Sequence, residues 1–244
     1  MMQFPIFSRN GEIVITSFKV MSSHFRDNPD FQRTYWNRKS LPAALSNRFL
    51  GNPRSHFVFR DPVSRFLSYF KDKFRQEPAR MLAEDRLKPE NLQACQRYWL
   101  ESTDVDVSNV PDACEALLSA SIGDVINWLP ENYTRDGHTM PQLMSLYFDW
   151  RGLNFRLKPV AVYLQDDPDD VAQLAADLKF KIAEKANSTS RYNASVSITD
   201  AERDKIKAIY AADMHLFENS LDVALFERPK HIQAAVRQLE ISTR

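Results

Sequence analysis

The chain has 244 residues, and its 32 Lys and Arg side chains balance its 32 Asp and Glu side chains. A chain without net charge has no global basic field, so we expect no nucleic-acid partner, and any anion site must be local. The hydrophobic fraction of 43% suits a globular core, whereas no segment approaches the roughly 20 apolar residues that span a bilayer.

The start of the chain and its cysteines indicate the expected compartment. The start of the chain, MMQFPIFSRN, lacks the charged and apolar regions of a secretory signal. Cys95 and Cys114 are the chain's two cysteines and have no metal-type spacing, so we expect free thiols in a reducing compartment and no metal site. The sequence predicts one cytoplasmic α/β domain over residues 1–244, with a helical tail at 229–244. It does not exclude a homo-oligomer.

The first predicted strand covers residues 12–18, where Ile13, Val14 and Ile15 form a run typical of a buried parallel strand. The loop that follows is Lys19-Val20-Met21-Ser22-Ser23. This order resembles the layout of a phosphate loop: a strand is followed by a lysine, then by hydroxyl residues and the start of a helix. None of the five glycines lies in it, which excludes a Walker A loop and a G-x-G-x-x-G dinucleotide fingerprint. An ordinary surface lysine after a strand remains the alternative.

The central stretch is His56–Phe70, read HFVFRDPVSRFLSYF. A buried strand at 57–59 turns at Arg60-Asp61-Pro62, where Asp suits a helix cap and Pro the first helical position. The next residues place Val63, Phe66, Leu67, Phe70 and Phe74 on one apolar helix face, with Arg65 and Ser68 on another side. Arg60, Arg65 and Ser68 then make a candidate phosphate site. An amphipathic helix with solvated arginines is the alternative.

The rest of the chain predicts further helices and one more strand. Residues 76–89 are charged and read as a loop, and helices are expected at 89–100, 111–129 and 168–178. Pro141 opens a short helix and is preceded by His138, a candidate general base because imidazole titrates near neutrality. A buried strand is expected at 159–164, a loop at 187–197, and a helix capped by Thr199 with Glu202 as a capping box.

Four of these pieces, in order, resemble the membrane-associated carbohydrate sulfotransferases, the family of chondroitin, dermatan and heparan sulfotransferases. Residues 17–23 resemble the family's 5′-phosphosulfate loop, and residues 60–69 its 3′-phosphate motif. His138 with Pro141-Gln142 is similar to its H-x-x-P-Q segment. Tyr210, Asp213 and Phe217 are similar to its C-terminal Y-x-x-D-x-x-x-F helix. Two residues depart from the loop pattern, since Phe18 replaces the usual proline and Met21 a small residue.

The resemblance implies a central parallel sheet flanked by helices, in the P-loop-kinase-like sulfotransferase fold. It implies 3′-phosphoadenylyl sulfate (PAPS) as donor, 3′-phosphoadenosine 5′-phosphate (PAP) as product, no metal, and a carbohydrate, glycolipid or similar small molecule as acceptor. Lys19 would contact the bridging oxygen at the sulfate, and the loop Val20-Met21-Ser22-Ser23 would hold the 5′-phosphate. Arg60 and Ser68, with Arg65 as a weaker candidate, would hold the 3′-phosphate. His138, with His24 second, would be the base.

Two other functions remain open at this point. A non-catalytic module on the same fold would bind a nucleotide or glycan without turnover. A small-molecule kinase on the related fold is disfavoured by the missing glycine-rich loop.

Overall fold

The computed structural model describes residues 5–21, 25–35, 55–133, 135–150, 153–156, 161–181 and 195–218. The chain divides into two compact units. Unit 1 comprises Met1–Asp61, Met140–Glu184 and Tyr210–Arg244, and unit 2 comprises Pro62–Thr139 and Lys185–Ile209. The expected tail at 229–244 lies outside the described residues, as does most of the expected loop at 187–197.

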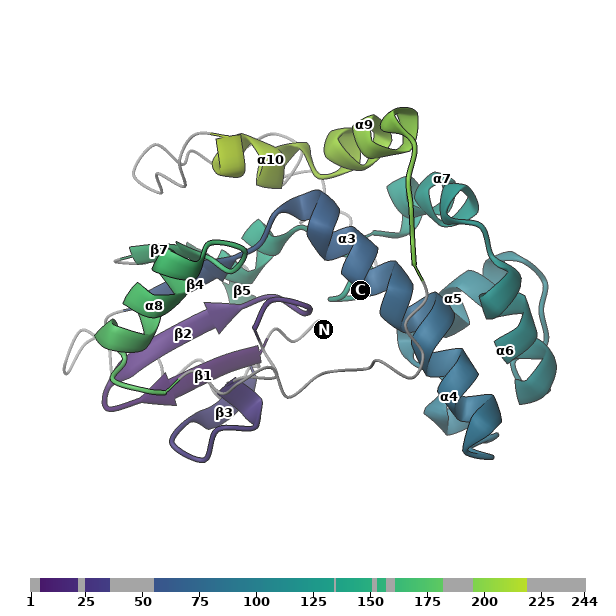
Figure 1. The fold of residues 1–244 in the computed structure, drawn as a ribbon, viewed down its shortest axis with the longest axis horizontal. Helices are drawn as coiled ribbons and strands as arrows, with labels where there is room; N and C mark the ends of the chain where they lie inside the picture. The colour runs from purple at the N-terminus through teal and green to yellow at the C-terminus, as the bar shows by residue number, and fades with distance from the viewer. Residues whose placement is uncertain are drawn as a thin grey trace. The chain divides into compact units, whose positions relative to one another are not determined.

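Unit 1 is built on a five-stranded sheet with strand order β3-β1-β2-β4-β7 (Figure 1). The strands are β1 (Pro5–Arg9), β2 (Glu12–Thr16), β3 (Gln32–Tyr35), β4 (Ser55–Phe59) and β7 (Ala161–Leu164). β2, β4 and β7 are parallel neighbours, as their apolar runs predict, whereas β1 is antiparallel to both β2 and β3. The α/β class is therefore as predicted, but the sheet is mixed and not parallel throughout.

A tight hairpin explains the antiparallel strand. Asn10 and Gly11 join β1 to β2 with φ values of 51° and 82°. Positive φ at both central residues is the geometry of a type I′ turn, which pairs its flanking strands antiparallel. Because β1 reverses direction against both of its neighbours, β3, β2, β4 and β7 run the same way and end at one edge of the sheet.

Helices cover both faces of this sheet. On one face, Val14, Val58 and Tyr163 share a core with Leu174 and Leu178, from α8 (Pro168–Asp177) and the residue that ends it. On the other face lie η3 (Gln142–Leu146), a 3-10 helix beside β2, and α10 (Ala211–Glu218), whose Phe217 ring lies 6.5 Å from that of Phe59. Unit 1 also holds a hairpin of β5 (Tyr147–Trp150) and β6 (Leu153–Arg156).

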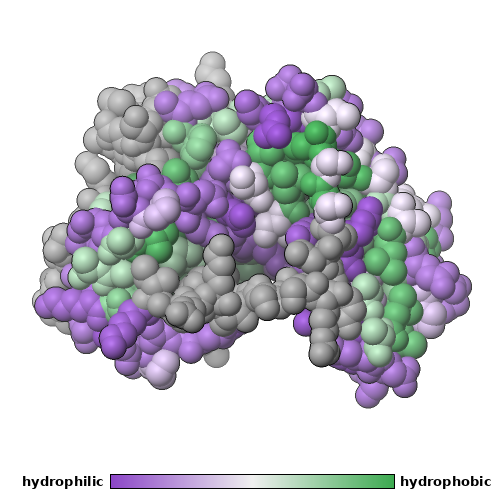
Figure 2. All heavy atoms as spheres, in the orientation of Figure 1, coloured by the Kyte–Doolittle hydropathy of each residue, from purple (hydrophilic) through white to green (hydrophobic). Residues whose placement is uncertain are grey.

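Unit 2 is helical in its described part. α3 (Pro62–Lys71) continues through a π-helical turn, η1 (Asp72–Gln76), into α4 (Glu77–Ala83). The other elements are η2 (Pro89–Asn91), α5 (Ala94–Ser102), α6 (Val110–Ser119), α7 (Ile122–Asn132) and α9 (Asp200–Ile209). Aromatic rings join α3, η1 and α5, since Phe74 stacks on Phe70 and meets Trp99 edge-on. Hydrophilic side chains gather over α9 (Figure 2), whose Ile206 is buried.

Several predicted elements are confirmed and others are wrong. α3 begins at Pro62, and Thr199 and Glu202 form the expected capping box before α9. The loop expected at 76–89 instead holds α4, with Pro78 in the first helical turn, where proline is tolerated. The helix expected at 111–129 is interrupted at Ala120, and a second capping box at Ser121 begins α7. Among the described residues, no helix is long and apolar enough to cross a membrane.

Candidate functional site

The carboxyl edge of the sheet in unit 1 gathers several of the predicted site residues. Lys19 follows β2, Arg60 follows β4, and Gln165 and Asp166 follow β7. β2 connects onward to β3 on one side of the sheet, whereas β4 connects onward to β7 on the other. In open α/β sheets, ligands bind beyond the carboxyl ends of the strands at such a switch point. The residues of the loops and the topology of the sheet thus indicate the same place for a ligand, the carboxyl edge of the sheet.

The loop after β2 has an unusual backbone. The Val20 amide donates to the Ser17 carbonyl at 3.3 Å, which closes a turn over residues 17–20. Lys19, at the third position of this turn, has φ +66°, and Met21 has φ +44°. Turns with positive φ at the third position normally carry Gly or Asn there. Each non-glycine residue in this region costs about 1–2 kcal/mol, and such strain gathers at functional sites.

Side-chain burial limits what the loop can offer a ligand. Val20 and Met21 are buried in the core of unit 1, whereas Lys19 is only partly buried. The Met21 amide donates to Oε1 of Gln165 at 2.9 Å. Val20 and Met21 can therefore contact an anion only through their backbones, and the Met21 amide becomes available only when Gln165 releases it.

A glutamine from a distant segment fixes the backbone of Arg60. Oε1 of Gln142 accepts the Arg60 N–H at 2.9 Å, and its Nε2 donates to the Arg60 carbonyl at 2.6 Å. The carboxylate of Asp213 accepts the N–H groups of Gln142 and Leu143 at 2.7 and 3.1 Å. Gln142 and Asp213 have no exposed surface. A buried chain of hydrogen bonds thus runs from α10 through the start of η3 to Arg60.

The guanidinium of Arg60 bridges two strand ends. Nη1 donates to the Lys19 carbonyl at 3.4 Å, and Nε lies 3.3 Å from Oδ1 of Asp166. The distance to Asp166 is that of an ion pair, but Nε is too poorly aligned for a hydrogen bond with any described residue. Hydrogen bonds weaken steeply when they bend, so this contact acts through charge alone. Arg60 therefore retains donor capacity for a ligand, and Asp166 is the group that would compete with an anion.

Arg65 and Ser68 lie on α3 in unit 2. Arg65 was expected on another side than the apolar face of its helix, and it is only 1% exposed. Its Nη2 donates to the His138 carbonyl at 3.0 Å and reaches the Gly137 carbonyl at 3.5 Å. Ser68 is half-buried. The contacts of Arg65 anchor the 137–138 turn and so favour a structural role over phosphate binding.

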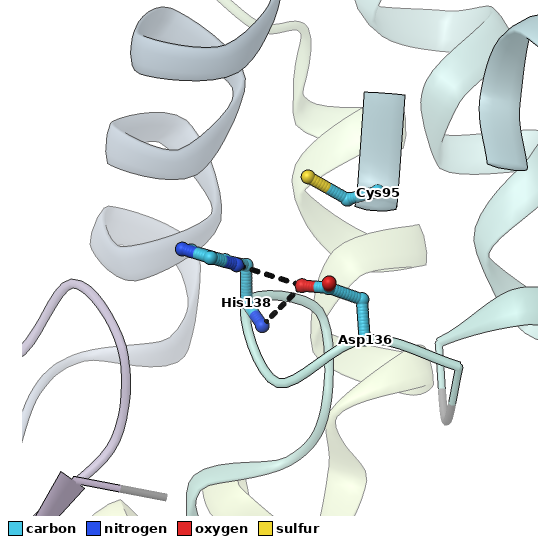
Figure 3. A group of neighbouring side chains, drawn as sticks. All are labelled: Cys95, Asp136 and His138. Atoms are coloured by element: carbon cyan, nitrogen blue, oxygen red, sulfur yellow. Dashed lines mark hydrogen bonds and ion pairs between the residues drawn. The ribbon is translucent and has the colours of Figure 1, made fainter. Parts of the chain in front are cut away.

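His138 is held by a neighbouring carboxylate (Figure 3). Both its Nδ1 and its backbone N lie 2.7 Å from Oδ1 of Asp136, and the side chains are 18% and 13% exposed. Burial by itself raises the pKa of Asp136, but the hydrogen bond and charge of His138 outweigh it, so the pKa lies below its ordinary value. A carboxylate that orients an imidazole in this way is the arrangement of a general base and its orienting group.

The structure brings the predicted site residues together only in part. Lys19 and Arg60 contact each other in unit 1, and Arg65 contacts His138 in unit 2. Ser22, Ser23 and His24 lie outside the described residues. The sequence did not single out Gln165 and Asp166. A polar pair directly after a predicted parallel strand was the available signal, because such positions line the ligand edge of the sheet.

Comparison with known proteins adds no relative: no protein-family model, no curated protein and no solved structure matches this chain.

Proposed function

We propose that the protein transfers a sulfuryl group from PAPS to a hydroxyl of a carbohydrate, glycolipid or similar acceptor. The observation that carries the proposal is the contact between Lys19 and Arg60 at the carboxyl edge of β2 and β4. These are the two cations to which the resemblance assigns the two ends of the donor. They lie far apart in the sequence, and the Arg60 guanidinium reaches the main-chain carbonyl of Lys19.

The chemistry gives each group a task. The acceptor oxygen attacks sulfur in line, the bond from sulfur to the bridging oxygen breaks, and negative charge grows on the departing 5′-phosphate. An ammonium at that oxygen stabilises the transition state, so we assign this role to Lys19. The guanidinium fork of Arg60 suits the dianionic 3′-phosphate that distinguishes PAPS from ATP. Ser68, and the amides of Val20 and Met21, stay proposed phosphate donors.

The acceptor hydroxyl must lose its proton during the attack, and we assign this role to His138. A placed base contributes roughly 100- to 10,000-fold to such a transfer. Its Nδ1 is bonded to Asp136, and we assign the proton to Nε2. The carboxylate then stabilises the resulting imidazolium.

One observation favours a second candidate, a non-catalytic module that binds a nucleotide or glycan. Asp166 pairs with Arg60, and Gln165 occupies the Met21 amide, so two groups needed for phosphate binding already have protein partners. The same contacts are those that a ligand would exchange on binding. The two functions therefore differ in turnover and not in the groups that bind the nucleotide.

The first test is calorimetric titration of the purified chain with PAP, with ATP and AMP as controls. We expect micromolar or tighter binding of PAP, lost when the 3′-phosphate is absent and greatly weakened in Arg60→Ala. Labelled PAPS with an acceptor panel then tests turnover, which Lys19→Ala should reduce by about 100-fold or more. Binding without turnover on the panel would favour the module, and preference for ATP would favour a kinase.

The proposed compartment is the cytoplasm. Cys95 and Cys114 are both buried and unpaired. Free thiols are typical of proteins that work in a reducing compartment.

A further inference from the structure

Three potential metal ligands converge in unit 2, although Cys95 lies far from the other two in the sequence (Figure 3). Cys95 belongs to the first turn of α5, and Asp136 and His138 belong to the turn after α7. One ligand atom from each of the three side chains lies within 4.8 Å of the other two. The spacing of the cysteines alone predicts no metal site, because the other ligands come from a distant segment.

The ligand types select a class of ion. Thiolate, imidazole and carboxylate together suit Zn²⁺ and similar borderline-soft divalent ions, whereas Mg²⁺ and Ca²⁺ prefer oxygen alone. Bonds of about 2.0–2.3 Å to a tetrahedral Zn²⁺ place the ligand atoms roughly 3.3–3.8 Å apart. Nδ1 of His138 and Oδ1 of Asp136 now lie 2.7 Å apart, so an ion bound by both would replace their hydrogen bond. Three protein ligands also leave a fourth position open for water.

The surroundings hold the three ligands in place. Arg65 anchors the turn through the carbonyls of Gly137 and His138. A capping box between Gln93 and Gln96 fixes the first turn of α5, and Nε2 of Gln96 donates to the Lys73 carbonyl at 2.8 Å. Lys73 lies in the π-helical turn, a rare backbone form that is frequent at functional sites. The positions of the ligands are thus set by groups that do not bind the ion.

The local charge also suits a cation. The charged groups that act on the Cys95 thiol are Asp136, Lys73 and Glu77. Lys73 is itself paired with Asp72 at 2.8 Å and Glu77 at 3.0 Å. Three carboxylates therefore face two cations, Lys73 and the Arg65 guanidinium, and the lysine is paired with two of those carboxylates.

We propose that Cys95, Asp136 and His138 form a binding site for a divalent ion of the Zn²⁺ class. Binding forms a bond from the metal to Sγ and releases the thiol proton to solvent. The site goes beyond the proposed sulfuryl transfer and does not depend on it, since that reaction is assigned no metal. If both hold, an ion at this site would occupy the imidazole of His138 and inhibit transfer.

Burial keeps the Cys95 thiol out of solvent and favours its protonated form. Cys95 has no exposed surface, and burial raises the pKa of its thiol to about 12. A metal ion must displace this proton, because the thiolate is the ligand.

The test is a Co²⁺ titration of the reduced, chelator-treated full chain, followed by absorption. We expect one equivalent to bind with a near-ultraviolet thiolate-to-cobalt band and the visible bands of a four-coordinate ion, and Zn²⁺ to displace it, because Zn²⁺ binds such ligands more tightly than Co²⁺. Cys95→Ser should lose the thiolate band. Asp136→Asn and His138→Gln should each weaken binding by at least ~10-fold, as even changes around metal ligands often do.

Cys114→Ser is the matched control. Since the chain has only two cysteines, this variant leaves Cys95 as its one thiol without disturbing the cluster. A full thiolate band in Cys114→Ser supports the site even where Cys95→Ser fails to fold. Absence of the band in the wild-type chain, its loss in Cys114→Ser, or its persistence in a folded Cys95→Ser would each overturn the proposal.

Discussion

The side chain of Gln142 forms two hydrogen bonds with the backbone of Arg60: it accepts the Arg60 N–H at 2.9 Å and donates to the Arg60 carbonyl at 2.6 Å. The glutamine is fully buried, as is Asp213, which accepts its N–H. Arg60 stands where β4 ends, immediately before the residues that lead into α3. Gln142 is thus a positioning residue for the candidate phosphate-binding arginine.

Removing these two hydrogen bonds should lower both the stability of the fold and the affinity for the donor. Gln142→Ala leaves the Arg60 N–H and carbonyl without their partner, which costs about 1–3 kcal/mol for a buried group. Urea denaturation measures the loss, and PAP titration measures the effect on affinity. Gln173→Ala is the control, because Gln173 is an exposed glutamine on α8 whose amide bonds Asp177 at the surface. Equal stability of the two variants would show that Gln142 does not hold Arg60.

The elements that were predicted correctly are those that depend on a local pattern of residues. The apolar runs at 13–15 and 57–59 became β2 and β4, because buried parallel strands need continuous apolar residues. The Asn10-Gly11 pair is a local hairpin signal, and it is the feature from which β1 and the mixed sheet could have been predicted. Arg65 is buried for a reason that lies outside the local pattern. Its partners are carbonyls at 137–138, and a pattern within one helix contains no information about them.

The candidate site also contains residues that a local pattern predicts and residues that only long-range contacts reveal. Lys19 and Arg60 were identifiable because each follows a predicted strand, and parallel strands bring their ends together. Asp166 and the hydrogen-bond chain from Asp213 depend on contacts across long stretches of chain. The cluster of Cys95 and His138 depends on packing between α5 and a distant turn, which spacing does not reveal.

We expect Lys19 to lower the stability of the fold while being required for activity. Its φ of +66° is a conformation that glycine adopts freely, so Lys19→Gly should raise the free energy of unfolding by about 0.5–1 kcal/mol while abolishing transfer. Urea denaturation and the PAPS assay measure the two effects. Lys179→Gly is the matched control, because Lys179 has φ +54° at the exposed end of α8. It should gain similar stability with unchanged activity. Full activity in Lys19→Gly would remove the ammonium from the mechanism.

Asp166 should weaken donor binding by competing for Arg60. Neutralising it in Asp166→Asn removes a carboxylate 3.3 Å from Nε, so PAP should bind about 2- to 5-fold more tightly. Calorimetry at low and high salt checks this, since the gain should shrink as salt screens the exposed charge. Asp169→Asn makes the same change in net charge on the exposed first turn of α8. A similar gain in Asp169→Asn would mean that net charge, and not the Arg60 contact, controls affinity.

The pair of His138 and Asp136 should contribute stability that depends on pH. The pKa of folded Asp136 lies below its ordinary value of 3.8, because the hydrogen bond and charge of His138 outweigh the effect of burial. A depressed folded pKa gives stability that is present above 3.8 and is lost as the pH falls through the folded value. Removing the imidazole abolishes this contribution.

His138→Ala should therefore lower the free energy of unfolding by about 1.5–3 kcal/mol near neutral pH, the usual loss for a hydrogen bond to a charged group. The difference from wild type should shrink toward zero as the pH drops below 3.8, since protonated Asp136 gains little from histidine. Urea denaturation at a series of pH values measures it. His215→Ala, an exposed histidine on α10, should stay close to wild type throughout. A deficit in His138→Ala that is constant with pH would mean that lost packing, and not the ion pair, causes it.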